Sequence, residues 1–135
     1  MKNNSFYMFV KKSELCKAVL LMNKDIHFVA VINKNGRITE SEFSNDSEYL
    51  SSNELEMIAM QRSLQTSMIR EFDQKLSQFN QTITMRKHTV EFVTPLGEDI
   101  LFVISNIGVD VKHLSTALSS MIFSFDKLDA KSVVI

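Results

Sequence analysis

The feature of this chain that most constrains its fold is an apolar run followed by an Asn-Gly pair. Residues 26–32 (IHFVAVI) are rich in Ile, Val and Phe, residue types that are enriched in strands. Asn35 and Gly36 supply the two positive-φ positions that a type I′ turn requires. Residues 37–43 alternate polar and apolar side chains, which is typical of a strand with one face in water. The pattern predicts an antiparallel hairpin whose second strand lies at the edge of a sheet.

Helices are predicted by apolar spacing, which is rarely interrupted because the whole chain has one proline and three glycines. A first helix is expected over residues 13–22, beginning with a serine cap. Ser51 and Glu54 form the capping box of a long helix over about residues 53–78. Asp110 is expected to cap a final helix. The apolar stripe of that helix consists of Val111, Leu114, Leu118, Met121, Ile122 and Phe125.

Three further strands are expected between the long helix and the final helix, over residues 82–86, 89–94 and 100–105. The last of them is almost wholly apolar and is therefore expected at the centre of the sheet. Residues 95–97 (Pro-Leu-Gly) are expected to turn the chain between the last two strands. The predicted order is α-β-β-α-β-β-β-α. The fold class is α+β: a sandwich with a five-stranded antiparallel sheet and helices on its faces.

The length of the chain, 135 residues, indicates a single domain over residues 1–135. We expect its core to span about residues 13–125. The apolar residues 6–10 are interpreted as an N-terminal arm that either extends the first helix or covers the core. Residues 126–135 are interpreted as a C-terminal tail.

Composition excludes several classes of partner. The formal net charge of −1 supplies no general attraction to nucleic acid. The longest apolar runs contain five residues, whereas a membrane-spanning helix needs about 20. Cys16 is the single cysteine, so no internal disulfide is possible, which fits a reducing cytoplasm. We therefore expect a cytoplasmic protein that binds neither nucleic acid nor a membrane.

The sequence contains no recognisable catalytic or metal-binding set. His27, His88 and His113 lie on three different elements, and none has a second ligand at metal-binding spacing. Cys16 lies beside the apolar stripe of the first helix, with no visible base or cationic setting to activate the thiol, and it is interpreted as a small buried residue. No glycine-rich phosphate loop or serine nucleophile motif occurs. We therefore expect no enzyme activity, no cofactor and no metal.

Residues 40–56 form a serine-rich and acidic stretch. Such a stretch could bind a cation, accept phosphate groups or dock a basic partner, although the spacing of a calcium loop is missing. It could equally be a solvated loop that leads into an acid-favouring helix N-terminus. The sequence leaves these alternatives open.

The long helix carries more apolar surface than one sheet can cover. At 100° per residue, its apolar side chains fall into two sectors about 115° apart. One sector consists of Leu55, Ile58, Ile69, Phe72 and Leu76. The other consists of Met57, Met60, Leu64 and Met68. Together they cover over half of the circumference, whereas a helix on a sheet needs a stripe of roughly 100°.

One of these two sectors must therefore meet a second helix, and which sector faces inward stays open. In the first interpretation a second copy of the chain covers it, because flexible thioethers make adaptable contact surfaces. The predicted interface consists of Met57, Met60, Leu64 and Met68, with Ile83 and Met85 on the neighbouring strand. In the alternative, the first or the last helix of the same chain packs alongside.

The order of elements resembles the roadblock (dynein light chain) family of profilin-like sandwiches. The resemblance is carried by residues 26–38, a hydrophobic strand with an Asn-Gly turn and a return strand. It is also carried by residues 97–105, a strand followed by Asp110-Val111 at the beginning of the final helix. Residues 15–125, about four fifths of the chain, are similar to small single-domain archaeal proteins of this type.

This resemblance implies a homodimer or heterodimer joined through the middle helix and the neighbouring strand, with the sheet extended across both subunits. It also implies a non-catalytic scaffold or regulator that acts with small GTPases or other proteins. The alternative function is a small-ligand sensor with an internal cavity between sheet and helices. His27, Thr82 and Thr84 are the inward polar residues that the sequence offers for such a cavity.

Overall fold

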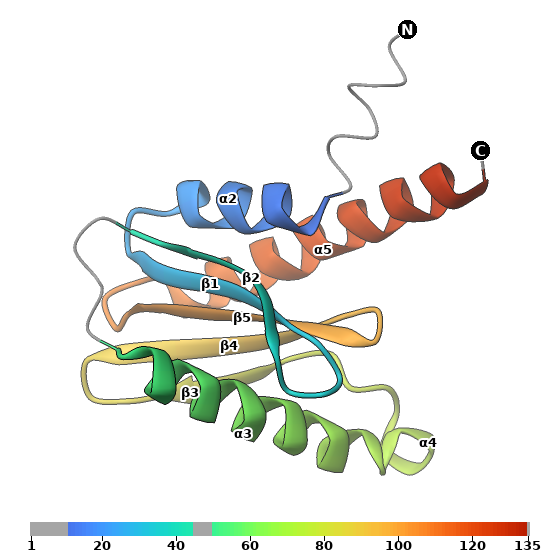
Figure 1. The fold of residues 1–135 in the computed structure, drawn as a ribbon, viewed down its shortest axis with the longest axis horizontal. Coiled ribbons are helices and arrows are strands. Elements are labelled where there is room, and N and C mark those ends of the chain that lie inside the picture. The colour runs from blue at the N-terminus through green and yellow to red at the C-terminus, as the bar shows by residue number, and fades with distance from the viewer. Residues whose placement is uncertain (1–10, 45–49, 135) are drawn as a thin grey trace, which may run out of the picture.

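The computed structural model (Figure 1) describes residues 11–44 and 50–134. In it a central sheet separates the helix of residues 52–70 from the first and the last helix. The elements are α2 (Lys12–Met22), β1 (Ile26–Ile32), β2 (Ile38–Phe43), α3 (Ser52–Arg70), α4 (Asp73–Leu76), β3 (Thr82–Met85), β4 (Thr89–Leu96), β5 (Asp99–Asn106) and α5 (Val111–Val134). The predicted arm, residues 6–10, and residues 45–49 of the acidic stretch lie outside the described residues.

The five strands are arranged in the order β2-β1-β5-β4-β3, and every neighbouring pair is antiparallel. The predictions of an α+β class, of a five-stranded antiparallel sheet and of the element order are confirmed. β5 is the central strand, as its apolar sequence indicates, and β2 lies at one edge. β3 forms the other edge.

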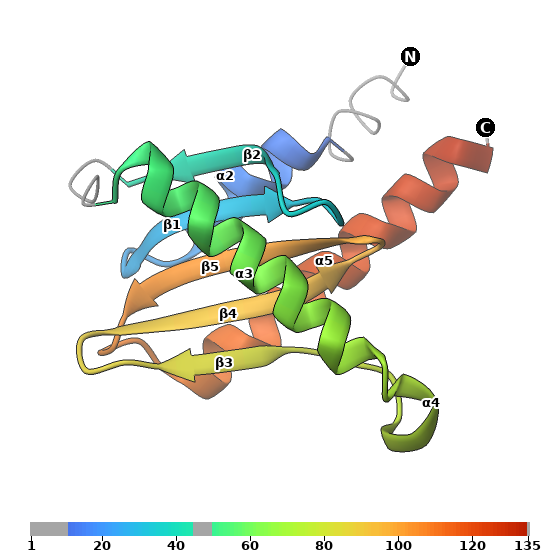
Figure 2. The ribbon, with the colours of Figure 1, turned by 60° about the horizontal axis from the view of Figure 1, so that its bottom comes forward.

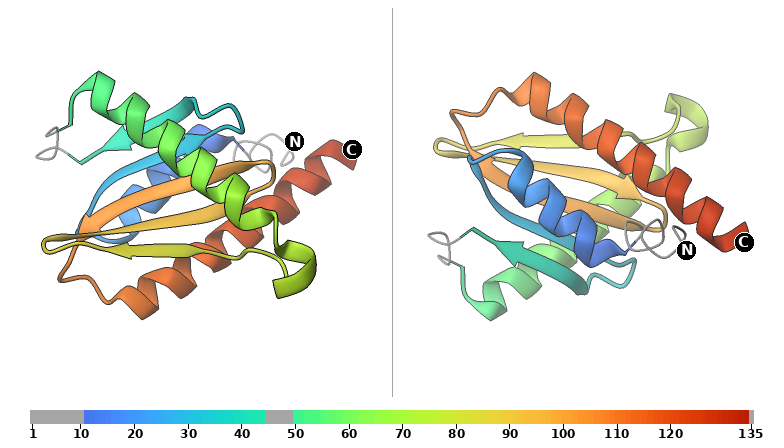
Figure 3. Two further views of the ribbon diagram at one scale, coloured as in Figure 1. Left: turned by 90° about the horizontal axis from the view of Figure 1, so that it is seen from below. Right: turned by 90° about the horizontal axis from the view of Figure 1, so that it is seen from above.

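The helices cover the two faces of the sheet unequally. α2 and α5 lie side by side on one face, and α3 crosses the other face diagonally from β2 towards β3 (Figures 2 and 3). Between the sheet and the pair α2 and α5 lies a cluster of 16 buried apolar residues, among them Val29, Phe92 and Leu118. The cluster beneath α3 has eight such residues, and Ala59 is the only one that α3 contributes.

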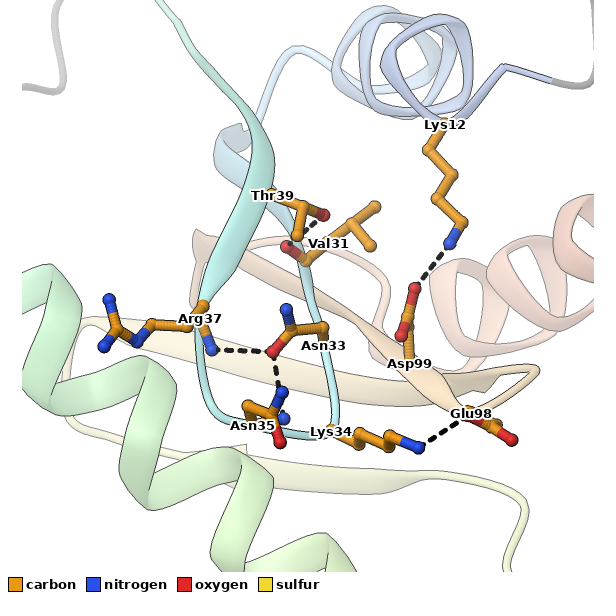
Figure 4. A network of polar contacts seen from close by, with 9 residues as sticks. All are labelled: Lys12, Val31, Asn33, Lys34, Asn35, Arg37, Thr39, Glu98 and Asp99. Atoms are coloured by element: carbon orange, nitrogen blue, oxygen red, sulfur yellow. Dashed lines mark hydrogen bonds and ion pairs between the residues drawn. The ribbon is translucent and has the colours of Figure 1, made fainter.

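The first hairpin is correctly placed, but the predicted type I′ turn is wrong. Gly36 has φ +78°, whereas Asn35 is not among the described residues with positive φ. The turn is longer because the side chain of Asn33 organises it: Asn35 N–H and Arg37 N–H donate to Asn33 Oδ1 at 2.9 and 3.0 Å (Figure 4). Gly36 N–H donates to the carbonyl of Asn33 at 2.9 Å. A turn closed by an Asx side chain competes with the two-residue form.

Helix boundaries depart from the predictions in three places. α2 begins one residue early, with Lys11 as N-cap and no side-chain cap, so the predicted serine cap is wrong. α3 ends at Arg70 rather than near residue 78, and in the segment that follows the N–H of Phe79 donates to Asp73 Oδ1 at 3.0 Å. α5 continues to Val134, so the predicted tail is helical; residues 126–134 contain neither glycine nor proline to stop it.

Two helix N-termini are built as predicted. Ser51 and Glu54 form the reciprocal capping box of α3, at 2.8 and 3.1 Å. Asp110 Oδ1 accepts the N–H of His113 at 3.0 Å, which caps α5.

Pro95 lies inside β4 rather than in the predicted turn, opposite Ile100. It is tolerated because β3 pairs with β4 only as far as Val93, so the missing N–H of Pro95 has no strand to face.

Candidate interaction surface

The outward face of α3 is formed by the predicted methionine sector. Met57, Met60, Leu64 and Met68 are 60, 61, 62 and 56% exposed. Within the described residues, the alternative that α2 or α5 covers these side chains is wrong, because both helices lie on the opposite face of the sheet. The side chains that α3 buries are Ala59, Arg62 and Thr66.

The other apolar sector of the predicted long helix is divided between core and surface. Leu55 and Ile58 are half-buried against the core beneath α3. Ile69, in the last turn of α3, and Phe72 and Leu76, beyond the end of that helix, remain exposed. The exposed apolar surface therefore continues from the middle of α3 to its C-terminal end.

The edge strand β3 lies next to the C-terminal half of α3, and its predicted interface residues point away from that helix. Ile83 pairs with Phe92, and Met85 pairs with Val90. Phe92 and Val90 belong to the core under α2 and α5, and cross-strand partners share a face, so Ile83 and Met85 lie on that face too. They are 40 and 60% exposed. The structure thus brings them to the same sheet edge as α3, but not beside the methionines.

An open groove of about 420 Å³ lies between α3 and β3. It is lined by Arg62, Gln65, Thr66, Met68, Ile69, Thr82, Thr84 and Val93. Thr82 and Thr84 are two of the three residues that the sequence offers for a ligand cavity. The third, His27, lies at the beginning of β1 and does not line this groove. The groove is open to solvent, whereas the ligand-sensor alternative predicts an internal cavity.

Beneath the groove, three charged side chains connect α3, β4 and the turn after β3. Arg62 donates from Nε and Nη2 to Glu91 Oε1 at 3.0 and 2.8 Å. Arg86 Nε donates to Glu91 Oε2 at 2.7 Å. Arg62 and Glu91 are buried, while more than half of the Arg86 side chain is exposed. The carboxylate of Glu91 raises the pKa of Arg86 above its ordinary value, by hydrogen bonding and by charge.

Sequence reasoning missed this network, although a signal for it exists. Glu91 is the one acid within the apolar strand β4, and Arg62 is the one charged residue between Met57 and Met68. A lone charge on an apolar face must be paired when it is buried. The partner of each residue lies 29 positions away in sequence, so the pairing itself is visible only in the tertiary structure.

The sequence matches no protein-family model and no curated protein. Solved structures share its fold. A Roadblock/LC7 domain from Streptomyces avermitilis is similar over 85% of this chain and 94% of that domain, with a TM-score of 0.69 and 14% identity. The gliding protein MglB from Thermus thermophilus is similar over 88% of this chain and 92% of its own, with a TM-score of 0.64 and 13% identity. An MglB with a tetrameric arrangement is similar over 89 and 91%, with a TM-score of 0.63 and 12% identity. This chain has the roadblock fold.

The roadblock fold confirms the resemblance that residues 26–38 and 97–105 indicate. Within this fold the thiol of Cys16 is fully buried between α2 and the sheet. Burial, with the nearby charges of Glu40 and Glu42, raises the pKa of Cys16 to about 12. The thiol therefore stays protonated at neutral pH, as its interpretation as a small core residue requires.

Two further properties concern metal ions and membranes. Over residues 11–44 and 50–134, the structure brings together no group of three or more His, Cys, Asp or Glu side chains that could hold a metal ion. Among the helices of the same residues, none combines the length and the apolar character that crossing a bilayer requires.

Proposed function

We propose that this roadblock domain is a non-catalytic interaction module that works as a homodimer, with the second copy docked on the outward face of α3 and the free edge of β3. The observation that carries the proposal is the row of four exposed side chains, Met57, Met60, Leu64 and Met68, on a helix that no other described element covers. An apolar surface of this extent on a single helix is a feature of protein interfaces.

The chemistry of the helix face favours a copy of the same chain as the partner. In a two-fold interface each residue approaches residues of the identical surface, so like charges would repel one another. Between Met57 and Met68 the only charged residue is Arg62, and it is buried and paired with Glu91. The outward face of this segment is thus uncharged and can oppose itself. The similar MglB with a tetrameric arrangement supports self-association.

The edge strand supports the same arrangement. Beyond β3 no described strand is paired, so the backbone groups on its outer side are available for a ladder with another strand. Pairing of β3 with β3 of the partner would extend the sheet across both subunits, as the roadblock resemblance implies. Ile83 and Met85 would then be covered at the edge on one face of the sheet, and the α3 side chains on the other.

We further propose that the dimer serves in the cytoplasm as a scaffold or regulator of a small GTPase. The roadblock resemblance supports this role. It is also supported by the absence from the sequence of any set of nucleophile, base and orienting residue, which leaves binding as the function that the surface can perform.

The test of the dimer is the double substitution Leu64→Glu and Met68→Glu. Two buried like charges per subunit oppose association, whereas both side chains are exposed in the single subunit, so its fold is expected to persist. Light scattering coupled to size-exclusion chromatography should give a dimer mass for the wild type and a monomer mass for the variant, with unchanged helical circular dichroism.

The matched control is Leu21→Glu, which places a charge on an apolar side chain that is 84% exposed on α2, on the other face of the molecule. This variant should remain dimeric. A wild type of monomer mass, or a Leu64/Met68 variant that stays dimeric, would contradict the proposed interface.

The regulatory role is tested by co-purification. The tagged wild type and the Leu64/Met68 variant are expressed at native level in the organism of origin, and bound proteins are identified by mass spectrometry. A small GTPase enriched with the wild type is the expected result, to be checked by direct binding of the purified GTPase loaded with GDP or a GTP analogue. No GTPase binding in either nucleotide state would contradict this role.

A further inference from the structure

α3 contacts the first hairpin, where the Ser63 hydroxyl donates to the carbonyls of Asn33 and Lys34 at 3.4 Å, but over the rest of the sheet its one directional attachment among the described residues is an ion-pair network. Of its apolar side chains only Ala59 is fully buried, and Leu55 and Ile58 are half-buried. Apolar contacts are non-directional, so they alone allow a helix to shift or rotate over a sheet. Charge-assisted hydrogen bonds are directional and impose a geometry.

The network of Arg62, Glu91 and Arg86 joins the parts of the molecule that would contact a partner. Arg62 lies in the middle of α3, Glu91 on β4, and Arg86 directly after the edge strand β3. Both guanidinium groups bind the one carboxylate, through different oxygens, at 2.7 to 3.0 Å. Glu91 is also opposite Thr84, which lines the groove between α3 and β3 together with Arg62.

The guanidinium group of Arg62 has a further neighbour on the sheet. Its guanidinium carbon lies 5.8 Å from the ring centroid of Phe102 on the central strand. Arg62 thus connects α3 to β4 through the ion pair with Glu91 and to β5 through the contact with Phe102.

We propose that the Arg62–Glu91–Arg86 network is the positioning element of the interface: it sets the register of α3 against the edge strand β3 and so determines how a second copy can contact both at once. This inference rests on the proposed dimer. A buried ion pair contributes little net stability compared with apolar residues of the same size, but it can select one geometry among several. The three residues are positioning residues that need not touch the partner.

The central experiment replaces the buried pair by apolar residues of similar size, with Arg62→Met and Glu91→Met together. Because no unpaired charge is left buried, this variant is expected to fold with the circular dichroism of the wild type. The dissociation constant of its homodimer, measured by analytical ultracentrifugation, is expected to be at least ten-fold higher than that of the wild type. A second variant, Arg86→Ala, removes the exposed partner and leaves Arg62 paired with Glu91, so it requires no repacking of buried side chains. It should weaken the dimer less than the double substitution does.

The matched control is Lys12→Met, which removes an ion pair between α2 and β5 on the other face of the molecule, where Lys12 Nζ lies 2.5 Å from Asp99 Oδ2 (Figure 4). Its dimer affinity should stay within two-fold of the wild type. A comparable loss of affinity in this control would overturn the inference, since a general loss of stability would then explain the effect.

Register is measured directly by cross-linking. In a Cys16→Ala background, one cysteine is placed in turn at Met57, Met60, Leu64 or Met68, and the disulfide-linked dimer formed with oxidised glutathione is quantified. With the network intact, one position should cross-link at least five-fold better than the others. In the Arg62/Glu91 variant the preference should flatten or move to another position.

The outcomes separate the two proposals. If the Arg62/Glu91 variant keeps both the wild-type affinity within two-fold and the wild-type cross-linking profile, the network only supports the fold, and the positioning role is wrong while the dimer stands. If the wild type itself is monomeric and gives no cross-link at any of the four positions, the dimer and the positioning role are both wrong.

Discussion

On one face of the sheet, α2 buries three apolar side chains and α5 buries four among its residues 111–127, while on the other face the 19-residue helix α3 buries one apolar side chain, that of Ala59. Both faces rest on the same strands, and the strand residues alternate between them. The difference lies in what the helices present. α2 and α5 turn their large apolar residues inward, whereas α3 turns small and polar residues inward and its methionines outward.

This difference indicates which part of the molecule carries stability and which part carries recognition. A fully buried Leu or Val contributes roughly 1.5–3 kcal/mol, so the seven side chains of α2 and α5 dominate the helix contribution to folding. Exposed methionines contribute little to the folding of one subunit. They gain that free energy only when a partner covers them, which is a reason for α3 to be the interaction surface.

Truncation of a helix side chain should cost more stability on the α2 and α5 face than on the α3 face. Leu118, fully buried on α5, and Ile58, half-buried on α3, are each replaced by Ala. Loss of a buried leucine creates a cavity, so Leu118→Ala should lower the free energy of unfolding by about 3 kcal/mol. Ile58→Ala should lower it by about 1 kcal/mol, because less area is removed from the core. Urea unfolding at one fixed protein concentration measures both, and equal losses would contradict the comparison.

On the α3 face, the contact with the first hairpin is expected to be tight despite the thin core. Gly36 has φ +78°, and a Cβ atom there would lie 3.1 Å from Met60 Cα. Gly36→Ala should therefore lower the free energy of unfolding by about 2 kcal/mol, from the left-handed backbone and the displaced helix. Gly108→Ala is the control, since its Cβ meets nothing within 4 Å. A loss below 0.5 kcal/mol at Gly36, on the order of a neutral surface change, would show that α3 moves freely.

On the α2 face, burial of Cys16 should make stability fall in alkali. The folded pKa of about 12 exceeds the ordinary 9.0, so between these values the unfolded chain releases a proton that the folded chain keeps. The free energy of unfolding should decrease by about 1.4 kcal/mol per pH unit above pH 9 from this group. Cys16→Ala removes this contribution, while the titration of lysines and tyrosines is common to both proteins. Parallel pH profiles for the two proteins between pH 8 and 11 would be inconsistent with a buried thiol.

The smallest expected effect concerns the segment that ends the α3 face. Ser77, after α4, has φ 78° and ψ 166°, a region that glycine adopts readily and other residues do not. Ser77→Gly should raise the free energy of unfolding by about 1 kcal/mol, after allowance for the flexibility of glycine in the unfolded chain. Ser67→Gly, on the exposed side of α3, should have the opposite sign, at about 0.5 kcal/mol. Thermal unfolding of both variants distinguishes the two signs.

Much of the fold follows from local patterns. The apolar run at residues 26–32 forms a buried strand with the predicted bounds, and the capping box of Ser51 and Glu54 begins α3. Both signals act over a few residues. The end of α3 at Arg70 was not predictable in the same way, because residues 71–78 contain neither glycine nor proline to signal it.

The candidate site was predictable in its composition and not in its orientation. Two apolar sectors around one helix indicate a surplus, but their hydrophobicity is similar, so the sequence does not say which sector faces the sheet. Small Ala59 and paired Arg62 settle the question in the structure, because they allow α3 to approach the strands closely. The face on which Ile83 and Met85 lie was likewise not predictable from the sequence, because it follows from the pairing register of β3 with β4.

By itself, the sequence of this chain determined the order of helices and strands, the antiparallel sheet and the excess of apolar surface on one helix. These properties depend on the periodicity and the caps of neighbouring residues, which act within about one helical turn or one strand. Only the tertiary structure decided which face of α3 is exposed and that Arg62, Glu91 and Arg86 meet beneath it. Those outcomes depend on side chains far apart in sequence, whose pairing is favourable only after the sheet has brought them together.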